Sequence, residues 1–199
     1  MGRSPLDDNL LIERALQGDQ SCFTALIERH RRYIYCIAYK VALHEEDALD
    51  ICQQVYIKLM NRLDAYQPGG SFKSWLAVMT TNTAIDFLRR SYRKEHPTDP
   101  VVLSGMVDSS IQGETATIRR DIDQQRRIEQ VQHAMAQLSP QQRAIFTLRF
   151  YEDMTTSDIA DQLGVTNKQI RVQLCRAVQK LRDVLNTDNK ENTYESKLG

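Results

Sequence analysis

The segment Thr155–Arg182 most constrains the fold, because its pattern predicts two short helices joined by a tight turn. In the first helix, the small residue Ala160 lies where two helices must cross closely, and Gly164 supplies the permissive backbone that ends the helix. Thr166 or Asn167 is suited to cap the second helix. Apolar residues then repeat at helical spacing, namely Ile170, Leu174, Ala177, Val178 and Leu181. The segment therefore predicts a helix-turn-helix.

The second helix of this segment is basic. From Thr166 to Arg182 it holds five Lys or Arg residues and no carboxylate. A helix of this kind can lie in the major groove of DNA, where amide and guanidinium groups contact bases and phosphates. The alternative is an ordinary amphipathic helix whose solvated face is basic. The candidates for DNA contact are Lys168, Gln169, Arg171, Gln173 and Arg176.

Charge in this chain is local rather than global. Among the 199 residues, 26 are Lys or Arg and 26 are Asp or Glu, so the net charge is zero. DNA binding must then come from basic patches and not from the overall field. A second basic patch consists of Arg89, Arg90, Arg93 and Lys94. Residues 95–118, which follow it, hold four acids and no Lys or Arg.

Cysteine usage and hydropathy indicate the compartment. The four cysteines, Cys22, Cys36, Cys52 and Cys175, form no CxxC pair and lie in apolar helical patterns, which predicts buried thiols in a reducing environment. No signal peptide opens the chain, and no apolar run approaches the roughly 20 residues that a membrane span needs. We therefore expect a cytoplasmic protein with no membrane span.

Helical periodicity along most of the chain predicts an all-α fold of two small helical domains. The loop AYQPGGS at 65–71 interrupts the first domain, and Ser71 is suited to cap the helix that follows. In the second domain, Ser139 and Pro140 predict the start of a helix. The expected division is a four-helix domain over 7–94, an acidic flexible linker over 95–123, a helix-turn-helix domain over 124–185 and a disordered tail over 186–199.

Three stretches of the chain together resemble one family. They are DALDICQQVYIKLMNRL at 47–63, SFKSWLAVMTTNTAIDFLRRSYRK at 71–94, and LSPQQRAIFTLRFYEDMTTSDIADQLGVTNKQIRVQLCRAVQKLR at 138–182. In this order they are similar to bacterial RNA polymerase sigma factors of the sigma-70 family, extracytoplasmic-function (ECF) class. The resemblance implies that the first domain binds core polymerase and the minus-10 promoter element, and that the second binds the minus-35 element. The partners it implies are the clamp of the β′ subunit, the flap of the β subunit, promoter DNA and an anti-sigma factor.

The first domain carries two implied sets of site residues. The helix over 47–63 matches the core-binding helix of the family, although a carboxylate is common there where Gln54 stands; the alternative is a solvated helix face. The core-binding set is Asp47, Asp50, Gln53 and Gln54. The helix over 71–94 matches the promoter-opening element, which holds single-stranded bases with aromatic platforms, amides and positive charge. The minus-10 set is Tyr66, Gln67, Lys73, Asn82, Arg89, Arg90 and Arg93; a plain connecting loop is the alternative for the first two.

The second domain carries the implied minus-35 set. Gln173 is suited to adenine, and Arg171 or Arg176 to guanine. The family often has a small hydroxyl residue where Val172 stands and a basic residue where Gln173 stands, so these departures are expected to change the bases that are read. Arg149, Thr155 and Thr156 lie near helix starts and are suited to phosphates. The full set is Arg149, Thr155, Thr156, Lys168, Gln169, Arg171, Gln173 and Arg176.

The leading hypothesis is a dissociable initiation subunit that recruits core polymerase to specific promoters and helps to melt them. One alternative is a free-standing helix-turn-helix transcriptional regulator, which would leave the segment from Asn82 to Lys94 unexplained. Another is a degenerate sigma-like module that binds an anti-sigma factor. The sequence shows no nucleophile–base pair, phosphate loop or metal-ligand spacing, so we expect no enzyme, no catalytic residue, no metal site and no cofactor.

Overall fold

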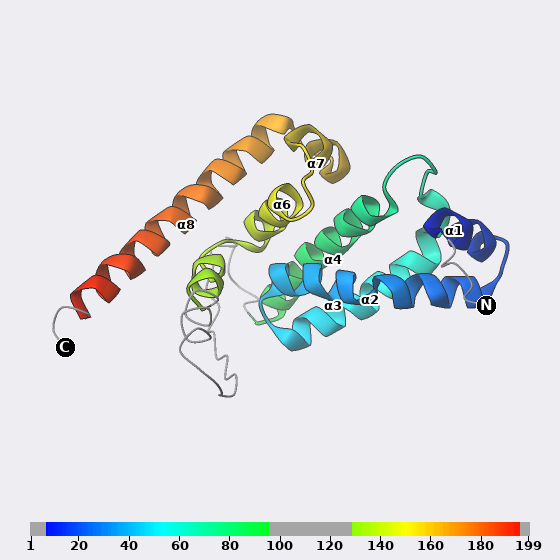
Figure 1. Ribbon diagram of the computed structural model, residues 1–199, viewed down its shortest axis with the longest axis horizontal. Coiled ribbons are helices and arrows are strands. Elements are labelled where there is room, and N and C mark those ends of the chain that lie inside the picture. The colour runs from blue at the N-terminus through cyan, green and yellow to red at the C-terminus, as the bar shows by residue number, and fades with distance from the viewer. Residues whose placement is uncertain (1–6, 96–128, 196–199) are drawn as a thin grey trace.

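The structure is a computed structural model that describes residues 7–95 and 129–195, with side chains over 7–92 and 129–186. Within these ranges the regular elements are helices, apart from an isolated bridge between Pro68 and Gly70 (Figure 1). The predicted all-α class is confirmed. Apart from Glu95, the predicted linker over 95–123 lies outside the described residues, as does the end of the predicted tail at 196–199.

The described residues form a first unit over 7–95 and a second unit over 129–195. Helices α2, α3 and α4 of the first unit pack around shared apolar side chains. Leu26 and Ile34 on α2, Ile51 and Leu59 on α3, and Leu76 on α4 are fully buried. Leu26 and Ile34 are eight residues apart, as are Ile51 and Leu59, which places each pair on one face of its helix. The elements are α1 (Asp8–Leu16), α2 (Gln20–Ala42), α3 (Glu45–Arg62), the short 3-10 helix η1 (Leu63–Ala65) and α4 (Phe72–Glu95).

Side-chain caps start two of these helices. Ser71 Oγ accepts the backbone N–H of Ser74 at 3.2 Å, so the predicted cap of α4 is present. Asp19 Oδ1 accepts the hydroxyl of Ser21 at 2.6 Å and the backbone N–H groups of Ser21 and Cys22 at 3.0 and 3.2 Å. The hydrogen bond from the Ser21 side chain, followed by those from Cys22, lowers the pKa of the Asp19 carboxyl to about 2.

Replacing Asp19 with alanine is expected to lower the melting temperature at neutral pH. Because the pKa of Asp19 is depressed in the folded state, its carboxylate stabilises the fold above the ordinary value of 3.8, and this contribution is lost as the pH falls through about 2. Thermal unfolding of both proteins at neutral pH and down to about pH 2 should therefore show a difference that closes with acid. Asp7→Ala is the control, because Asp7 precedes α1 without a side-chain cap bond. A difference for Asp19→Ala that stays constant with pH would contradict this assignment.

The second unit contains the predicted helix-turn-helix. Ser139 and Gln142 form a reciprocal capping box at the start of α6, and Thr155 and Asp158 form another at the start of α7. Gly164 ends α7 in the left-handed region with a φ of 65°, as predicted. A residue without Cβ adopts this backbone conformation without a steric penalty. Residues 129–136 are helical, and the helices after them are α6 (Pro140–Phe150), α7 (Thr156–Leu163) and α8 (Asn167–Glu195).

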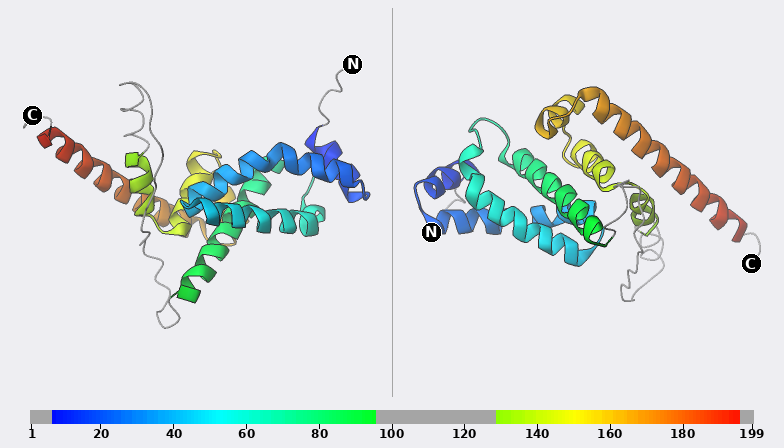
Figure 2. Two further views of the ribbon diagram at one scale, coloured as in Figure 1. Left: turned by 90° about the horizontal axis from the view of Figure 1, so that it is seen from below. Right: turned by 180° about the vertical axis from the view of Figure 1, so that it is seen from behind.

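Helix α8 is longer than the sequence pattern predicts. The expected disordered tail began at residue 186, whereas α8 continues to Glu195 and projects away from the rest of the protein in all views (Figures 1 and 2). Extending an existing helix adds one hydrogen bond per residue without a new nucleation cost, so a polar segment can continue a helix that a core has already nucleated. In the described parts of the chain, no helix has the length and apolar character to cross a membrane.

The two units pack against each other through α6, which contacts α2 and α4 (Figure 1). Ile37 on α2 and Val78 on α4 share a buried cluster with Ile145 and Leu148 on α6. At the same interface Arg143 is only 1% exposed. Its Nε donates to the backbone oxygen of Val41 at 2.6 Å and its Nη1 to that of Leu138 at 3.0 Å. Helical periodicity predicts neither this contact nor a buried arginine.

Polar and aromatic contacts surround this interface. The hydroxyl of Tyr33 on α2 donates to the carboxylate of Glu152, just beyond α6. Burial, and then the Glu152 carboxylate, raise the pKa of Tyr33 far above its ordinary value, so the hydroxyl stays protonated as a donor. Lys40 Nζ lies 3.8 Å from the ring centre of Tyr151. The two units therefore meet in a closed arrangement held by both apolar and polar contacts.

Candidate nucleic-acid interface

The first turns of α8 present four of the eight predicted minus-35 residues to solvent. Ile170 and Ala177 are buried against the rest of the second unit, and Gln173 is half-buried. Because these positions follow the 3.6-residue period, the remaining candidates lie on the outer side of the helix. The exposed members are Lys168, Gln169, Arg171 and Arg176.

Internal hydrogen bonds hold both glutamines of this helix face. Gln169 Oε1 accepts the backbone N–H of Thr166 at 2.8 Å and its hydroxyl at 2.9 Å, and the N–H of Gln169 donates back to Thr166 Oγ1 at 3.2 Å. Thr166 is therefore the cap of α8, one of the two residues predicted for that role. Gln142 on α6 donates Nε2 to Gln173 Oε1 at 3.3 Å. The direction of each glutamine amide is thus set within the protein.

Two of the three predicted phosphate contacts of the second unit are engaged in internal hydrogen bonds. Arg149 is half-buried, and its Nη1 donates to the backbone oxygen of Met154 at 3.3 Å. The hydroxyl of Thr155 donates to Asp158 at 2.7 Å as part of the cap of α7, and Thr156 is the first, half-buried residue of that helix. These residues order the start of α7. Their contact with phosphates stays a prediction.

The basic end of α4 is tied to α3. Arg89 Nη2 lies 2.8 Å from Asp86 Oδ1 in an exposed ion pair. Arg90 Nη2 donates to Gln54 Oε1 at 2.8 Å, and its Nε donates to the backbone oxygen of Asp86 at 3.2 Å. Asn82 is half-buried on the same helix. From the sequence, Gln54 is assigned to core polymerase and Arg90 to the minus-10 element, yet the two residues share a hydrogen bond. The spacing of residues along one helix cannot predict a contact between two helices.

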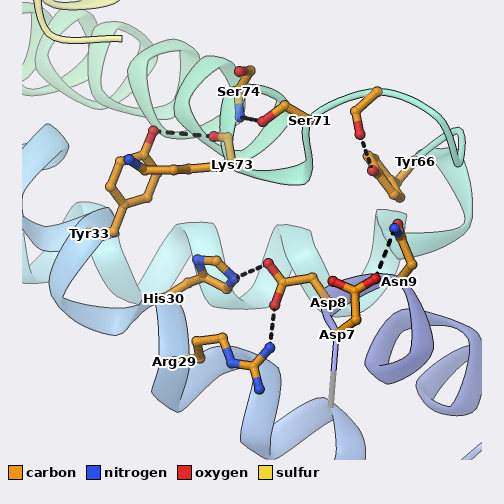
Figure 3. Close-up of polar contacts among 11 residues, drawn as sticks. Asp7, Asp8, Asn9, Arg29, His30, Tyr33, Tyr66, Ser71, Lys73 and Ser74 are labelled. Atoms are coloured by element: carbon orange, nitrogen blue, oxygen red, sulfur yellow. Dashed lines mark hydrogen bonds and ion pairs between the residues drawn. The ribbon is translucent and has the colours of Figure 1, made fainter. Parts of the chain in front are cut away.

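The loop before α4 is braced by Tyr66 (Figure 3). Tyr66 is 6% exposed, and its hydroxyl donates to the backbone oxygen of Gly70 at 2.6 Å. Its ring lies 5.2 Å from that of Phe72 and 5.7 Å from that of Trp75. Gln67 is exposed, so of the two loop candidates it is the one that the structure leaves open to an external base. Tyr66 supports the loop from inside. Its ring is buried in this structure, so its role in a base pocket stays a prediction.

Polar contacts anchor α1 and the start of α4 onto α2 (Figure 3). Asp8 pairs with Arg29 at 2.7 Å and with Nε2 of His30 at 2.9 Å. The Tyr33 hydroxyl lies 3.2 Å from the backbone oxygen of Lys73, whose Nζ sits 4.6 Å from the centre of the Tyr33 ring. Lys73 is exposed, so its ammonium group remains accessible at the open end of the loop.

Helix α3 exposes apolar residues that the predicted core-binding set does not include. Leu49, Ile57 and Met60 are 48%, 57% and 58% exposed. Together with the exposed candidates Asp50 and Gln53 they form a mixed face, which we call the α3 face. Asp47 and Gln54 are half-buried. The signal was present in the sequence, since these apolar residues fall off the stripe formed by Ile51, Val55 and Leu59.

The thiols are only partly as predicted. Cys22 and Cys52 are buried, and burial raises the pKa of Cys52 to about 11. Cys36 and Cys175 are exposed, so the prediction of four buried thiols is wrong for these two. Each lies on a helix whose apolar stripe passes to one side of it, which the general burial preference of cysteine does not register. Among the described residues, no three His, Cys, Asp or Glu side chains are grouped to hold a metal ion.

Comparison with known proteins assigns the family. The Sigma-70 region 2 model matches residues 26–94, and the Sigma-70 region 4 model matches residues 128–181, so together they cover more than half of the chain. The chain is 28% identical over 182 residues to "ECF RNA polymerase sigma factor SigE" of Mycolicibacterium smegmatis, covering 90% of this chain and 68% of that protein. It is 28% identical over 185 residues to "ECF RNA polymerase sigma factor SigM" of Mycobacterium tuberculosis, covering 92% and 87%. The chain belongs to the sigma-70 family, in the ECF class.

A solved structure shares the fold of this sigma factor. It is the sigma factor RpoE of Bartonella quintana in complex with the anti-sigma factor NepR, with a TM-score of 0.59 and 20% identity, covering 83% of this chain and 98% of that one. The region 2 match contains α3 and nearly all of α4, and the region 4 match contains the helix-turn-helix. As an ECF sigma factor, the protein is a transcription initiation factor that directs RNA polymerase to promoters.

Proposed function

We propose that this sigma factor uses three separate surfaces in initiation. The α3 face contacts core polymerase, α4 and the loop before it contact the minus-10 element, and the first turns of α8 contact the minus-35 element. The observation that carries the proposal is the exposed basic face of α8, on a helix-turn-helix whose caps and turn are all present. The protein acts in the cytoplasm, with core polymerase supplying the catalysis.

Binding of both promoter elements requires a conformational change from the closed arrangement of the two units. The names of the two promoter elements place them about 25 base pairs apart, which is roughly 85 Å along B-form DNA. In the structure, α6 of the second unit packs directly on α2 and α4 of the first. One closed molecule cannot reach both elements, so we infer that the α6 interface opens when the protein joins polymerase and promoter.

Two observations bear on the partners and on the alternatives. The region 2 match over residues 26–94 supports core and minus-10 binding, which a free-standing helix-turn-helix regulator does not need. The similar Bartonella sigma factor was solved with an anti-sigma factor, which supports a partner of that class here as well.

Transcription from purified components tests the proposal. Core polymerase with this chain should produce specific transcripts from a pool of genomic fragments, whereas core polymerase alone should not. Absence of any specific transcript would contradict the assignment and favour a degenerate module. Tight binding of the isolated chain to duplex promoter DNA without core polymerase would favour the free-standing regulator.

Arg176→Ala is expected to weaken recognition of the minus-35 element while leaving core binding intact. Arg176 is exposed on the outer side of α8, and a direct base contact is worth about 1–3 kcal/mol. Promoter affinity of the holoenzyme should therefore fall about tenfold, with core affinity measured separately by titration. Arg182→Ala is the matched control, because Arg182 is exposed on the same helix outside the predicted set. Equal losses of core and promoter affinity would count against a base-reading role.

A further inference from the structure

The charged side chains on the outer side of the first turns of α8, which we call the recognition face, are hydrogen-bond donors and not acceptors. Lys168, Arg171 and Arg176 are exposed cations, and neither ammonium nor guanidinium has an acceptor atom. Val172, exposed between them, adds no hydrogen-bonding group. Among the predicted minus-35 residues of α8, the groups that can accept a hydrogen bond from a base are therefore the amide oxygens of Gln169 and Gln173.

The amide oxygen of Gln169 is already filled. It accepts two hydrogen bonds from Thr166, one from the backbone N–H at 2.8 Å and one from the hydroxyl at 2.9 Å. A backbone N–H can only donate, so the atom facing it must be Oε1, and the usual ambiguity between amide oxygen and nitrogen does not arise. Two bonds use both lone pairs of the oxygen. Gln169 therefore presents its NH₂ group outward.

The amide of Gln173 is oriented through α6 by the same logic. The backbone N–H of Ser139 donates to Gln142 Oε1 at 3.1 Å, which fixes the oxygen of Gln142 at the capping box. The other end of the Gln142 amide is then Nε2, a donor, and its partner 3.3 Å away must be the oxygen of Gln173. Gln142 is 6% exposed, so its orientation is held by packing as well. This bond uses one lone pair of the Gln173 oxygen and turns the oxygen toward α6, so the NH₂ group is the end of the amide directed away from Gln142.

We propose that the predicted minus-35 residues of α8 read only hydrogen-bond acceptors on the base edges, because Thr166 and Gln142 hold the oxygens of Gln169 and Gln173 inward. The inference rests on the proposed function of α8 and specifies the chemistry that it recognises. In the major groove the acceptors are N7 and O6 of guanine, N7 of adenine and O4 of thymine; the amino groups of adenine and cytosine are donors and are not read. This replaces the expected pairing of Gln173 with adenine, which needs a glutamine oxygen to accept from the adenine amino group.

Base analogues in the upstream promoter element test the proposal with the assembled holoenzyme. The preferred element is first selected from duplexes with a randomised upstream region, and each purine is then replaced singly. A 7-deazapurine removes the N7 acceptor and is expected to lower affinity about tenfold at one or more selected positions. Replacing adenine with 2-aminopurine removes the major-groove amino group but keeps pairing with thymine, and should leave affinity within about twofold at every position.

One variant should reverse this behaviour. Gln142→Glu keeps an oxygen for the Ser139 N–H but replaces the donor that faces Gln173 with a second oxygen. The Gln173 amide should then turn its NH₂ group toward residue 142 and its oxygen toward the groove. The Gln142→Glu holoenzyme should lose about tenfold affinity for a 2-aminopurine duplex, relative to the adenine duplex selected with that variant, where the unmodified chain tolerates the analogue. Gln141→Glu, at an exposed neighbouring position, controls for the added charge and should tolerate the analogue.

The remaining outcomes are also decisive. Asn167 carries a further exposed amide at the first position of α8, outside the predicted set, and Asn167→Ala tests its contribution separately: the analogue profile should stay unchanged. A tenfold loss with 2-aminopurine in the unmodified protein, or tolerance of both analogues at every selected position, would overturn the donor-only reading. Selection of no upstream sequence at all would overturn the proposed function of α8, and the inference with it.

Discussion

Replacing Arg143 with alanine is expected to lower the free energy of unfolding by about 2–4 kcal/mol and to separate the two units. The guanidinium is buried with hydrogen bonds to the backbone oxygens of Val41 and Leu138, one in each unit. Burial lowers the pKa of Arg143 to about 10, so the side chain remains a cation at neutral pH. Alanine removes both donors and leaves a cavity beside two buried acceptors, which are the costly outcomes of a core substitution.

Urea denaturation and small-angle scattering check this prediction. The Arg143→Ala protein should unfold at lower urea and show a larger radius of gyration than the unmodified chain. Arg31→Ala is the control, because the Arg31 side chain is 66% exposed and should change neither quantity. Tyr33→Phe removes the bond to Glu152 without altering α6, so it should expand the molecule with a smaller loss of stability. An unchanged radius in both interface variants would contradict the closed arrangement.

Replacing Ile57 with glutamate is expected to weaken binding to core polymerase by at least about fivefold, because a buried anchor at a protein interface contributes about 1 kcal/mol or more. Ile57 is 57% exposed and belongs to the α3 face together with Leu49 and Met60. Glutamate is a good helix former, so α3 itself should persist. Fluorescence titration with core polymerase measures the affinity.

Val131→Glu is the matched control for Ile57→Glu. Val131 is 47% exposed on the helical segment of residues 129–136, so the substitution introduces the same charge at an exposed apolar site away from α3. The melting temperature of both variants should stay close to that of the unmodified chain. Equal affinity for core polymerase in the two variants would remove the α3 face from the proposed interface.

Local chemistry explains which parts of the fold were predictable. Ser139, Thr155 and Thr166 cap helices with groups three residues further along the chain, and Gly164 ends α7 in the left-handed region. Such interactions depend on neighbours in sequence, so the pattern of residues reveals them. The exposed positions on α8 followed from helical periodicity for the same reason.

Long-range packing explains the rest. Tyr66 reads as a free aromatic in a loop, yet it is buried because Phe72 and Trp75 fold back over it. Gln54 and Arg90 belong to different helices and share a hydrogen bond across them. Cys36 and Cys175 are exposed although their residue type favours burial. The first two arrangements are not encoded in the spacing of residues along one helix, whereas the two thiols lie beside the apolar stripes of their helices.

The sequence by itself determined the all-α class, the helix-turn-helix and the donors of its recognition helix, because each depends on contacts within a few residues. Only the tertiary structure decided how those donors are presented. The Gln142–Gln173 bond orients one amide through a contact between residues that are 31 positions apart in the sequence. The bond from Arg143 to Val41 joins the two units through residues that are 102 positions apart. Contacts at that separation form only when helices pack, so a linear pattern cannot specify them.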